Sequence, residues 1–416
     1  MKEKIIEKFN LGKTLTYDEL SYFFNGYLSN NVSDEEMTIV LKDICKNGLS
    51  EQEIFDLVDI FIKSGDTLHF DFPTIDKHST GGVGDKTTLV VLSILASCGV
   101  KIVKMSGRAL GYTGGTIDKL ESIGVNVNLT YEEVLKQVND IGMVITSQTK
   151  NLCPMDKKVY ALRDVTGTTN SLALIAISVM SKKIAGGADN ILIDVKVGRG
   201  ALVRTAKEAK KLADLMISIG KKYNKKVVCM LTRMDNPLGN NIGNSIEILE
   251  VLDVLKDKVR NNLYYLSYDM ASVMLSIYTG MKIRDARNKV KEAITSGKAY
   301  DKFVEFVNYQ GGKLEIRLER PIEIYAKESG FIKSIDAKEL GSLSMELGAG
   351  RSLTNKNIDY NAGIILEKNV CDFVSRGETL CMLYGKNSVD IDRAFKAFKI
   401  QKNRPFMKSI VIKTIK

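Results

Sequence analysis

The sequence at residues 77–88 reads KHSTGGVGDKTT and runs directly into the apolar stretch Leu89 to Ser97. Glycines in such a turn let backbone N–H groups approach an anion, hydroxyl groups donate to it, and the start of a helix adds positive potential. The turn differs from a P-loop because an aspartate separates its last glycine from Lys86, and from a dinucleotide fingerprint because Thr87 stands where the third glycine belongs. We therefore interpret it as a phosphate cradle, with a capped strand-to-helix turn as the alternative.

A second glycine-rich turn, KMSGRALGYTGGTID at residues 104–118, follows the predicted strand Lys101 to Met105. Parallel strands end at the same edge of a sheet, where ligands of open α/β sheets bind, so both turns can converge on one anion. Their ammonium and hydroxyl donors suit inorganic phosphate, because no carboxylate is among them. These donors are Lys77, Ser79, Thr88, Lys104, Ser106 and Thr116. Arg108 either joins them or pairs with Asp118 or Glu121.

Apolar periodicity divides the chain into three patterns. In the first 65 residues, apolar positions recur every three or four residues, and capping boxes begin helices at Ser33 and Ser50. Short β-branched runs then alternate with helical patterns, which predicts a mainly parallel sheet covered by helices. After Gly311-Gly312, short strands with glycine-rich turns, the last at Ser409 to Ile415, predict a separate domain. The apolar helix predicted at 172–184 is expected to return and pack on the N-terminal helices.

These patterns predict an α/β fold with an α+β part: a helical domain, a mainly parallel α/β domain with a central sheet, and a small C-terminal α+β domain. The helical domain takes residues 1–66 and 159–187, the α/β domain residues 67–158 and 188–325, and the C-terminal domain residues 326–416. The chain is therefore expected to enter each of the first two domains twice.

Composition and charge argue against several classes of protein. The 60 Lys and Arg residues outnumber the 50 Asp and Glu residues by 10, but they are spread along the chain, which favours a solvated surface over nucleic-acid binding. The 6 cysteines lie far apart and only His69 and His78 are present, so a zinc site or a disulfide framework is not expected. No stretch of 18 apolar residues and no apolar signal core occur, so we expect a cytoplasmic protein without a membrane partner.

Both glycine-rich turns resemble the hallmark motifs of the thymidine and pyrimidine-nucleoside phosphorylase family, as KHSTGGVGD at 77–85 and SGRALGYTGGTIDKLE at 106–121. The resemblance covers essentially the whole chain. It continues through YALRDVT at 160–166, SKKIA at 181–185, DVK at 194–196, NPLGN at 236–240 and LGAGR at 347–351. It implies a homodimer in which the nucleoside binds in the cleft between the helical and α/β domains.

The reaction implied by this resemblance is reversible phosphorolysis of uridine, thymidine and deoxyuridine to the free base and (deoxy)ribose 1-phosphate. Inorganic phosphate is the co-substrate, and no organic cofactor is implied. Arg163, Ser178 and Lys182 would hold the pyrimidine, and His78, Arg163 and Lys182 would take part in catalysis. Ser178 and Lys182 are four residues apart on one predicted helix, so both project from the same face. The phosphate residues implied are Lys77, His78, Ser79, Thr88, Lys104, Met105, Ser106 and Thr116.

Two other activities stay open at this stage. One is a thymidine phosphorylase restricted to 2′-deoxynucleosides; against it, Lys104-Met105-Ser106 resembles the version of the second motif found in relatives of broader specificity. The other is a phosphoribosyltransferase, which would need a carboxylate-rich magnesium–diphosphate site, whereas the first turn contains only Asp85. A lysine at position 104 can donate near the ribose, so uridine is an expected substrate.

Some positions depart from the family pattern. Tyr112 and Ala109 stand where many relatives have His and Gly, and Arg199 stands where many have a small residue. Potassium-binding relatives use oxygens at the positions matching Gly84, Lys86, Leu238, Asn241 and Glu250. Lys86 replaces a threonine there, and its ammonium would either occupy or repel the cation. The resemblance therefore allows potassium at these positions, whereas Lys86 argues against a requirement for it.

Overall fold

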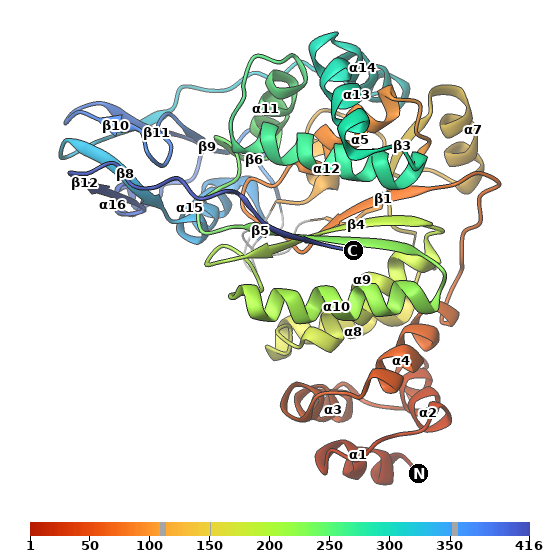
Figure 1. Ribbon diagram of the computed structural model, residues 1–416. Helices are drawn as coiled ribbons and strands as arrows, with labels where there is room; N and C mark the ends of the chain where they lie inside the picture. The colour runs from red at the N-terminus through yellow and green to blue at the C-terminus, as the bar shows by residue number, and fades with distance from the viewer. Residues whose placement is uncertain (109–113, 150, 352–356) are drawn as a thin grey trace.

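The computed structural model describes residues 1–108, 114–149, 151–351 and 357–416. The structure has three parts (Figure 1): N-terminal helices at one end, a central sheet with helices on both faces, and a smaller C-terminal part beside the sheet. This arrangement confirms the predicted fold class. No helix in the described ranges is long and apolar enough to span a membrane.

The helical part begins with four helices, whose starts are set largely by side-chain caps. Ser33 and Ser50 form the predicted capping boxes, and Thr16 forms a third. These helices are α1 (Lys2–Asn10), α2 (Tyr17–Leu28), α3 (Asp34–Asn47) and α4 (Glu51–Lys63). Helix α9 (Leu172–Ala185) packs on α4, and α8 (Pro154–Thr166) packs on α2 and α3. The predicted return of the apolar helix to the N-terminal helices is thus confirmed.

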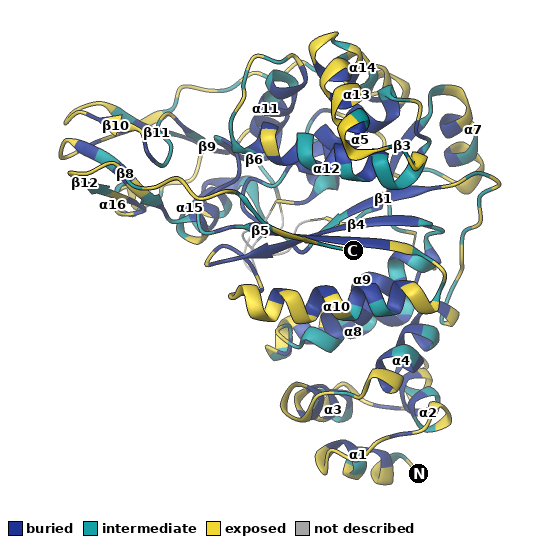
Figure 2. Ribbon diagram, in the orientation of Figure 1, coloured by how far each residue is buried: buried dark blue, intermediate teal, exposed yellow. Residues whose placement is uncertain are grey.

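The central sheet has six strands in the order β13-β5-β4-β1-β2-β3. The first five strands along the chain are parallel: β1 (Ile75–Ser79), β2 (Ile102–Ser106), β3 (Met143–Ser147), β4 (Asn190–Val197) and β5 (Lys226–Arg233). All eight residues of β4 are buried, as expected for a strand covered on both faces (Figure 2).

Helices cover both faces of this sheet. Helix α10 (Ala206–Lys222) lies against one face beside α9, and α5 (Thr87–Ser97) lies against the other (Figure 1). Helices α12 (Asn262–Thr279), α13 (Ile283–Thr295) and α14 (Lys298–Tyr309) pack around α5. The remaining helices of this part are α6 (Thr116–Glu121), α7 (Tyr131–Ile141) and α11 (Ser245–Leu255).

The C-terminal part consists of two small antiparallel sheets, ordered β6-β9-β11-β7 and β10-β8-β12. Their strands are β6 (Asn241–Gly243), β7 (Ile322–Tyr325), β8 (Gly330–Ile335), β9 (Gly363–Leu366), β10 (Phe373–Val374), β11 (Thr379–Tyr384) and β12 (Phe398–Gln401). Helices α15 (Ala337–Ser344) and α16 (Ile391–Lys396) accompany them, and a π-helical turn, Met345–Ala349, follows α15. Strand β6 therefore comes from a segment that lies between two elements of the α/β part.

The last strand differs from the sequence expectation. Strand β13 (Val411–Ile415) was expected in the C-terminal domain, but it pairs antiparallel with β5 and becomes the edge of the central sheet. The pattern of residue types predicts that this segment is a strand, but it does not determine which strand it pairs with. Every free edge of a sheet offers the same N–H and C=O groups for pairing. Strand β6, which lies within the α/β segment of the sequence, thus belongs to a C-terminal sheet, and β13, from the C-terminal segment, belongs to the central sheet.

We predict that Gly363→Ala lowers the free energy of unfolding by about 1–3 kcal/mol, because a new Cβ forces backbone shifts in packed surroundings. Gly363 has φ +154°, and a Cβ there would lie 2.2 Å from the carbonyl oxygen of Ile242 in β6. Urea denaturation measures the loss. Gly377→Ala is the control, because Gly377 also has a positive φ, +90°, but no atom within 4 Å of the new Cβ. Equal losses in the two variants would contradict a packing cause.

Candidate active site

Both glycine-rich turns leave the sheet at the same edge, as the sequence predicted. Strand β1 ends at Ser79 and β2 ends at Ser106, and the two strands are parallel neighbours. Strand β4 lies on the other side of β1, so its last residues reach this edge too. The site is built from side chains at these strand ends and from α9, which crosses beneath them.

Lys77 lies at the centre of the first group and has no exposed surface. Its Nζ donates to the hydroxyls of Thr87, at 2.6 Å, and Thr88, at 3.4 Å. It also lies 3.8 Å from a carboxylate oxygen of Asp85 and 3.9 Å from one of Asp194. Burial lowers the pKa of Lys77, although both carboxylates oppose this. The predicted phosphate donor is therefore already held by neighbouring side chains.

Lys196 completes this group from β4. Its Nζ is 2.7 Å from Asp194 and 3.8 Å from Asp85, and Ser79 Oγ donates to Asp85 at 2.6 Å. Burial opposes ionisation of Asp85, but the two lysines and its hydroxyl partners outweigh it and hold the pKa of Asp85 well below its usual value. Sequence reasoning gave Asp194 and Lys196 no role. The sequence pattern could have pointed to them: Asp194 and Lys196 are two residues apart in an otherwise apolar predicted strand, so both charges lie on the same face of it.

In a second group of charged side chains, one carboxylate, that of Asp76, binds two lysines. Asp76 in β1 accepts from Lys104 of β2 at 2.8 Å and from Lys183 of α9 at 2.7 Å. All three side chains are buried, and their formal charges sum to +1. Burial lowers the pKa of Lys104, and the ammonium of Lys183 adds to this effect. Neither Asp76 nor Lys183 was predicted, because their meeting depends on α9 returning to β1.

His78 lies on β1 between these groups and is partly exposed. Its pKa is well below the usual 6.5, first because of burial and then because of Lys183, Lys104, Lys182 and Lys77. The imidazole is therefore neutral near pH 7 and offers one donor and one acceptor nitrogen. It makes no hydrogen bond to the described residues, so both nitrogens are available to a ligand.

The predicted base-binding pair lies on one face of α9. Lys182 Nζ donates to Ser178 Oγ at 3.2 Å and forms an ion pair with Asp156 of α8 at 2.6 Å. It also lies 5.6 Å from the ring centroid of Tyr160. Because Lys183, the next residue, binds Asp76, α9 brings the predicted base residues next to the predicted phosphate residues.

Arg163 lies in the last turn of α8. Its guanidinium is buried and donates to the carbonyl oxygens of Thr168, Thr169 and Leu174, at 3.3, 3.1 and 3.2 Å. It forms no ion pair with the residues described, and burial lowers its pKa. Arg163 thus braces the turn between α8 and α9, and it adds a positive charge near Lys182.

The other predicted positions are placed as follows. Met105 is buried in the core, and Thr116 is the first residue of α6. Arg108 pairs with Glu121 at 2.5 Å, which is one of the two expected alternatives to phosphate binding. Arg199 is exposed and lies 3.8 Å from Asp336 at the start of α15. Tyr112 and Ala109 lie outside the described residues.

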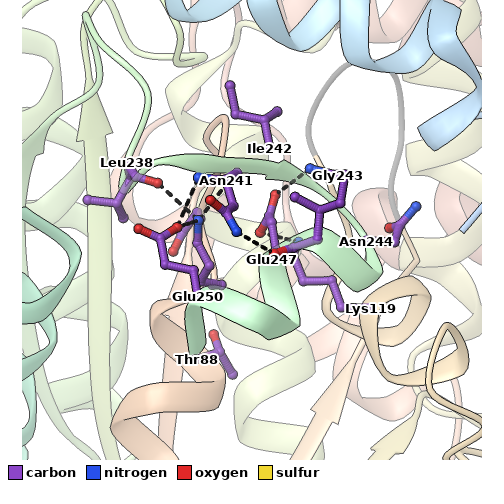
Figure 3. A network of polar contacts seen from close by, with 12 residues as sticks. Thr88, Lys119, Leu238, Asn241, Ile242, Gly243, Asn244, Glu247 and Glu250 are labelled. Carbon is purple, nitrogen blue, oxygen red and sulfur yellow. Dashed lines mark hydrogen bonds and ion pairs between the residues drawn. The ribbon is translucent and has the colours of Figure 1, made fainter. Parts of the chain in front are cut away.

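Lys86 occupies the positions that the resemblance assigned to potassium. Its Nζ, fully buried, donates to the carbonyl oxygens of Leu238, at 3.2 Å, and Asn241, at 2.7 Å, and to Glu250 Oε2, at 2.5 Å. Figure 3 labels the three residues whose oxygens accept these bonds. The first-turn residue Gly84 packs against the same carbonyls, since a Cβ there would lie 2.5 Å from Leu238 O. These residues do not fit a potassium ion in addition, because the ammonium already takes the oxygen ligands and neutralises the carboxylate.

Comparison with known proteins adds three matches to family models. Residues 3–65 match the helical bundle domain of a glycosyl transferase family, and residues 71–300 match the a/b domain of that family. Residues 331–403 match the pyrimidine nucleoside phosphorylase C-terminal domain.

Full-length relatives and one solved structure are also similar. The chain is 42% identical over 405 residues to the pyrimidine-nucleoside phosphorylase of Bacillus subtilis, covering 94% of this chain and 93% of that one. It is 40% identical over 395 residues to that of Geobacillus stearothermophilus, with 91% of each chain covered. The anthranilate phosphoribosyltransferase of Thermus thermophilus has the same fold over 74% of this chain and 99% of its own, with a TM-score of 0.60 and 16% identity.

We predict that His78 stays neutral throughout the range from pH 6 to 8. NMR of histidine-labelled protein should show no titration of the His78 ring there; the signal lost in His78→Gln identifies it. The folded state disfavours the imidazolium, so its contribution to stability is present above 6.5, the pKa in the unfolded chain, and is lost as the pH falls below it. A titration midpoint at or above 6.5 would contradict the placement of His78 among the lysines.

Proposed function

The chain belongs to the pyrimidine-nucleoside phosphorylase family of glycosyltransferases, and on this premise we propose that it catalyses the reversible phosphorolysis of pyrimidine nucleosides. Phosphate attacks C1′ of the nucleoside as the C–N bond to the base breaks. The products are the free base and ribose or deoxyribose 1-phosphate. No covalent bond to the enzyme is needed, because phosphate itself is the nucleophile.

The observation that carries this proposal is the shared carboxylate of Asp76. With one carboxylate between Lys104 and Lys183, the buried group has an excess positive charge when Lys104 is protonated, and burial lowers the pKa of Lys104 to about 7. Such a charge is costly without a partner, and a phosphate anion supplies one. The group lies at the carboxyl edge of a parallel sheet beside two glycine-rich turns, where anions bind.

The base side of the site supports departure of a pyrimidine. As the C–N bond breaks, negative charge builds on the base, and fixed donors near its carbonyls stabilise it. Lys182, Ser178 and the neutral ring of His78 are the donors that the geometry offers. Arg163 contributes its charge and keeps the α8–α9 turn in place, so we assign it a positioning role as well.

We further propose that uridine is a substrate alongside thymidine and deoxyuridine. Lys104 binds Asp76 at the end of β2, and a lysine at this position would give a 2′-hydroxyl a donor. A buried 2′-hydroxyl without a partner would cost about 1–3 kcal/mol. The alternative is an enzyme restricted to 2′-deoxynucleosides. The other alternative, a phosphoribosyltransferase, would need a carboxylate-rich magnesium–diphosphate site, whereas the first turn contains only Asp85.

The purified enzyme is expected to release free base from thymidine, deoxyuridine and uridine only when phosphate or arsenate is present. Inosine serves as the purine control, and a pyrimidine base with phosphoribosyl diphosphate tests the transferase alternative. Equal cleavage in phosphate-free buffer would contradict phosphorolysis. Cleavage of thymidine and deoxyuridine without cleavage of uridine would favour the alternative, a thymidine phosphorylase restricted to 2′-deoxynucleosides.

Lys182→Ala should lower kcat/KM by about 100-fold, the usual effect of removing one donor to a developing negative charge. Lys210→Ala, an exposed lysine on α10, is the control and should change little. Lys182 is a cleaner test than Arg163, whose removal also releases three buried carbonyl oxygens. A folded Lys182→Ala enzyme with unchanged kinetics would mean that the pyrimidine binds elsewhere.

We also propose that this enzyme works without potassium, because Lys86 supplies the positive charge from within the chain. Activity and melting temperature should be equal in potassium chloride and choline chloride at one ionic strength. Lys86→Thr should become dependent on potassium, since it frees three oxygen ligands and adds a hydroxyl. A parent enzyme that loses activity in choline chloride would contradict the proposal.

The oligomeric state and location follow from the family premise. We propose a homodimer in the cytoplasm that has no nucleic-acid partner. The charge of +10 is dispersed, so duplex DNA should bind weakly and without sequence preference. Light scattering of the purified protein tests the dimer.

A further inference from the structure

Helix α11 holds two buried glutamates three residues apart, and each binds a lysine from a different glycine-rich turn. Glu250 binds Lys86, the residue of the first turn that directly precedes α5. Glu247 lies 3.3 Å from Lys119 in α6, after the second turn (Figure 3). Residues at this spacing share one face of a helix, so one short helix reaches both turns.

The Lys119–Glu247 pair is deeply buried and incompletely hydrogen-bonded. Each residue is only 1% exposed. Lys119 Nζ and Glu247 Oε2 make no regular hydrogen bond within the described ranges, while Glu247 Oε1 accepts from the backbone N–H of Gly243. Burying two charges costs several kcal/mol, and an ordinary apolar pair would pack at least as stably. A contribution to stability therefore does not by itself account for this pair.

The backbone of the second turn lies directly on this pair. A Cβ at Gly114 would be 2.8 Å from Lys119 Nζ, 3.4 Å from the carbonyl oxygen of Gly243 and 3.6 Å from Glu247 Oε1. Gly114 is followed by Gly115 and Thr116, where α6 begins. The ammonium therefore lies beneath the segment that carries Thr116, a predicted phosphate donor.

The C-terminal part holds the N-terminal end of α11. Ser245, the first residue of α11, binds the carbonyl oxygen of Tyr360 through both its N–H and its hydroxyl, at 3.1 and 2.9 Å. Asn244 donates to the carbonyl oxygen of Ala349 at 2.7 Å. Arg351 also pairs with Asp118 of α6 at 2.7 Å. The start of α11 is thus hydrogen-bonded to the C-terminal part, and the same helix reaches the second turn through Glu247.

We propose that Lys119 and Glu247 are a positioning pair that sets Gly114–Thr116 for phosphate, using the C-terminal part as its support. The proposal rests on the proposed phosphorolysis and adds a residue pair to it. Neither side chain needs to touch substrate. Their effect should fall on phosphate and spare the nucleoside, because Lys119 lies under the phosphate turn and the base residues lie on α9.

The test is steady-state kinetics of Lys119→Met, Glu247→Gln and the double variant, with phosphate and nucleoside varied separately. Each single variant should raise the KM for phosphate about 10-fold or more, with the KM for nucleoside within about 2-fold, since small misplacements of a site carry costs of this order. The double variant should match the singles, because either change already breaks the pair. Val254→Ala, buried at the far end of α11, controls for general loss of stability.

The outcomes separate the two claims. A parent enzyme without phosphate-dependent cleavage would remove the proposed function itself. An active parent whose Lys119→Met and Glu247→Gln variants match Val254→Ala in both KM values would remove only the positioning pair, as would equal increases in both KM values. If Lys119→Met does not fold, Glu247→Gln keeps the shape of its side chain and gives the same readout.

Discussion

Pairing of buried ammonium groups with buried carboxylates is the interaction on which this site depends. Water cannot solvate a lysine at the carboxyl edge of the sheet, so each such lysine needs a partner or its charged form is lost. Lys77 and Lys196 are balanced by Asp85 and Asp194, and Lys86 is balanced by Glu250. These pairs join β1, β4, α5 and α11, and they fix the strand ends from which the glycine-rich turns depart.

Asp76 differs from these balanced groups, in which two carboxylates face two lysines or one carboxylate faces one. Asp76 serves two lysines, so the surplus charge falls where β1, β2 and α9 meet. Burial, and then the same charges, lower the pKa of His78 and keep its ring neutral, because an added proton would increase the surplus. The imidazole therefore suits hydrogen bonding to a ligand more than delivery of a proton from an imidazolium. An anion that binds in the site would offset the surplus positive charge and would also reduce the repulsion that disfavours a proton on His78.

The exchange of strands ties the C-terminal part to this chemistry. Strand β6 leaves the α/β part to pair with β9, and β13 returns to pair with β5. Directly after β6, α11 carries the two glutamates that hold lysines from both turns. Gly363 of β9 packs closely against β6, so the two parts are in contact at this position. The C-terminal part is therefore a support for the site, and its position affects the turns through hydrogen bonds and ion pairs.

Local signals in the sequence determined much of this protein. The caps at Ser33 and Ser50, the alternation of strands and helices, the apolar helix at 172–184 and the two glycine-rich turns depend on neighbouring residues, and each was predicted. The same motifs led to the family. The partners of the lysines were decided only by the tertiary structure: Asp76 with Lys183, Lys119 with Glu247, and β13 with β5. Such contacts join residues more than 100 positions apart, and a charge or a strand edge carries no local preference for one distant partner over another. Only the packing of the whole chain makes that choice, because it determines which charges are buried together.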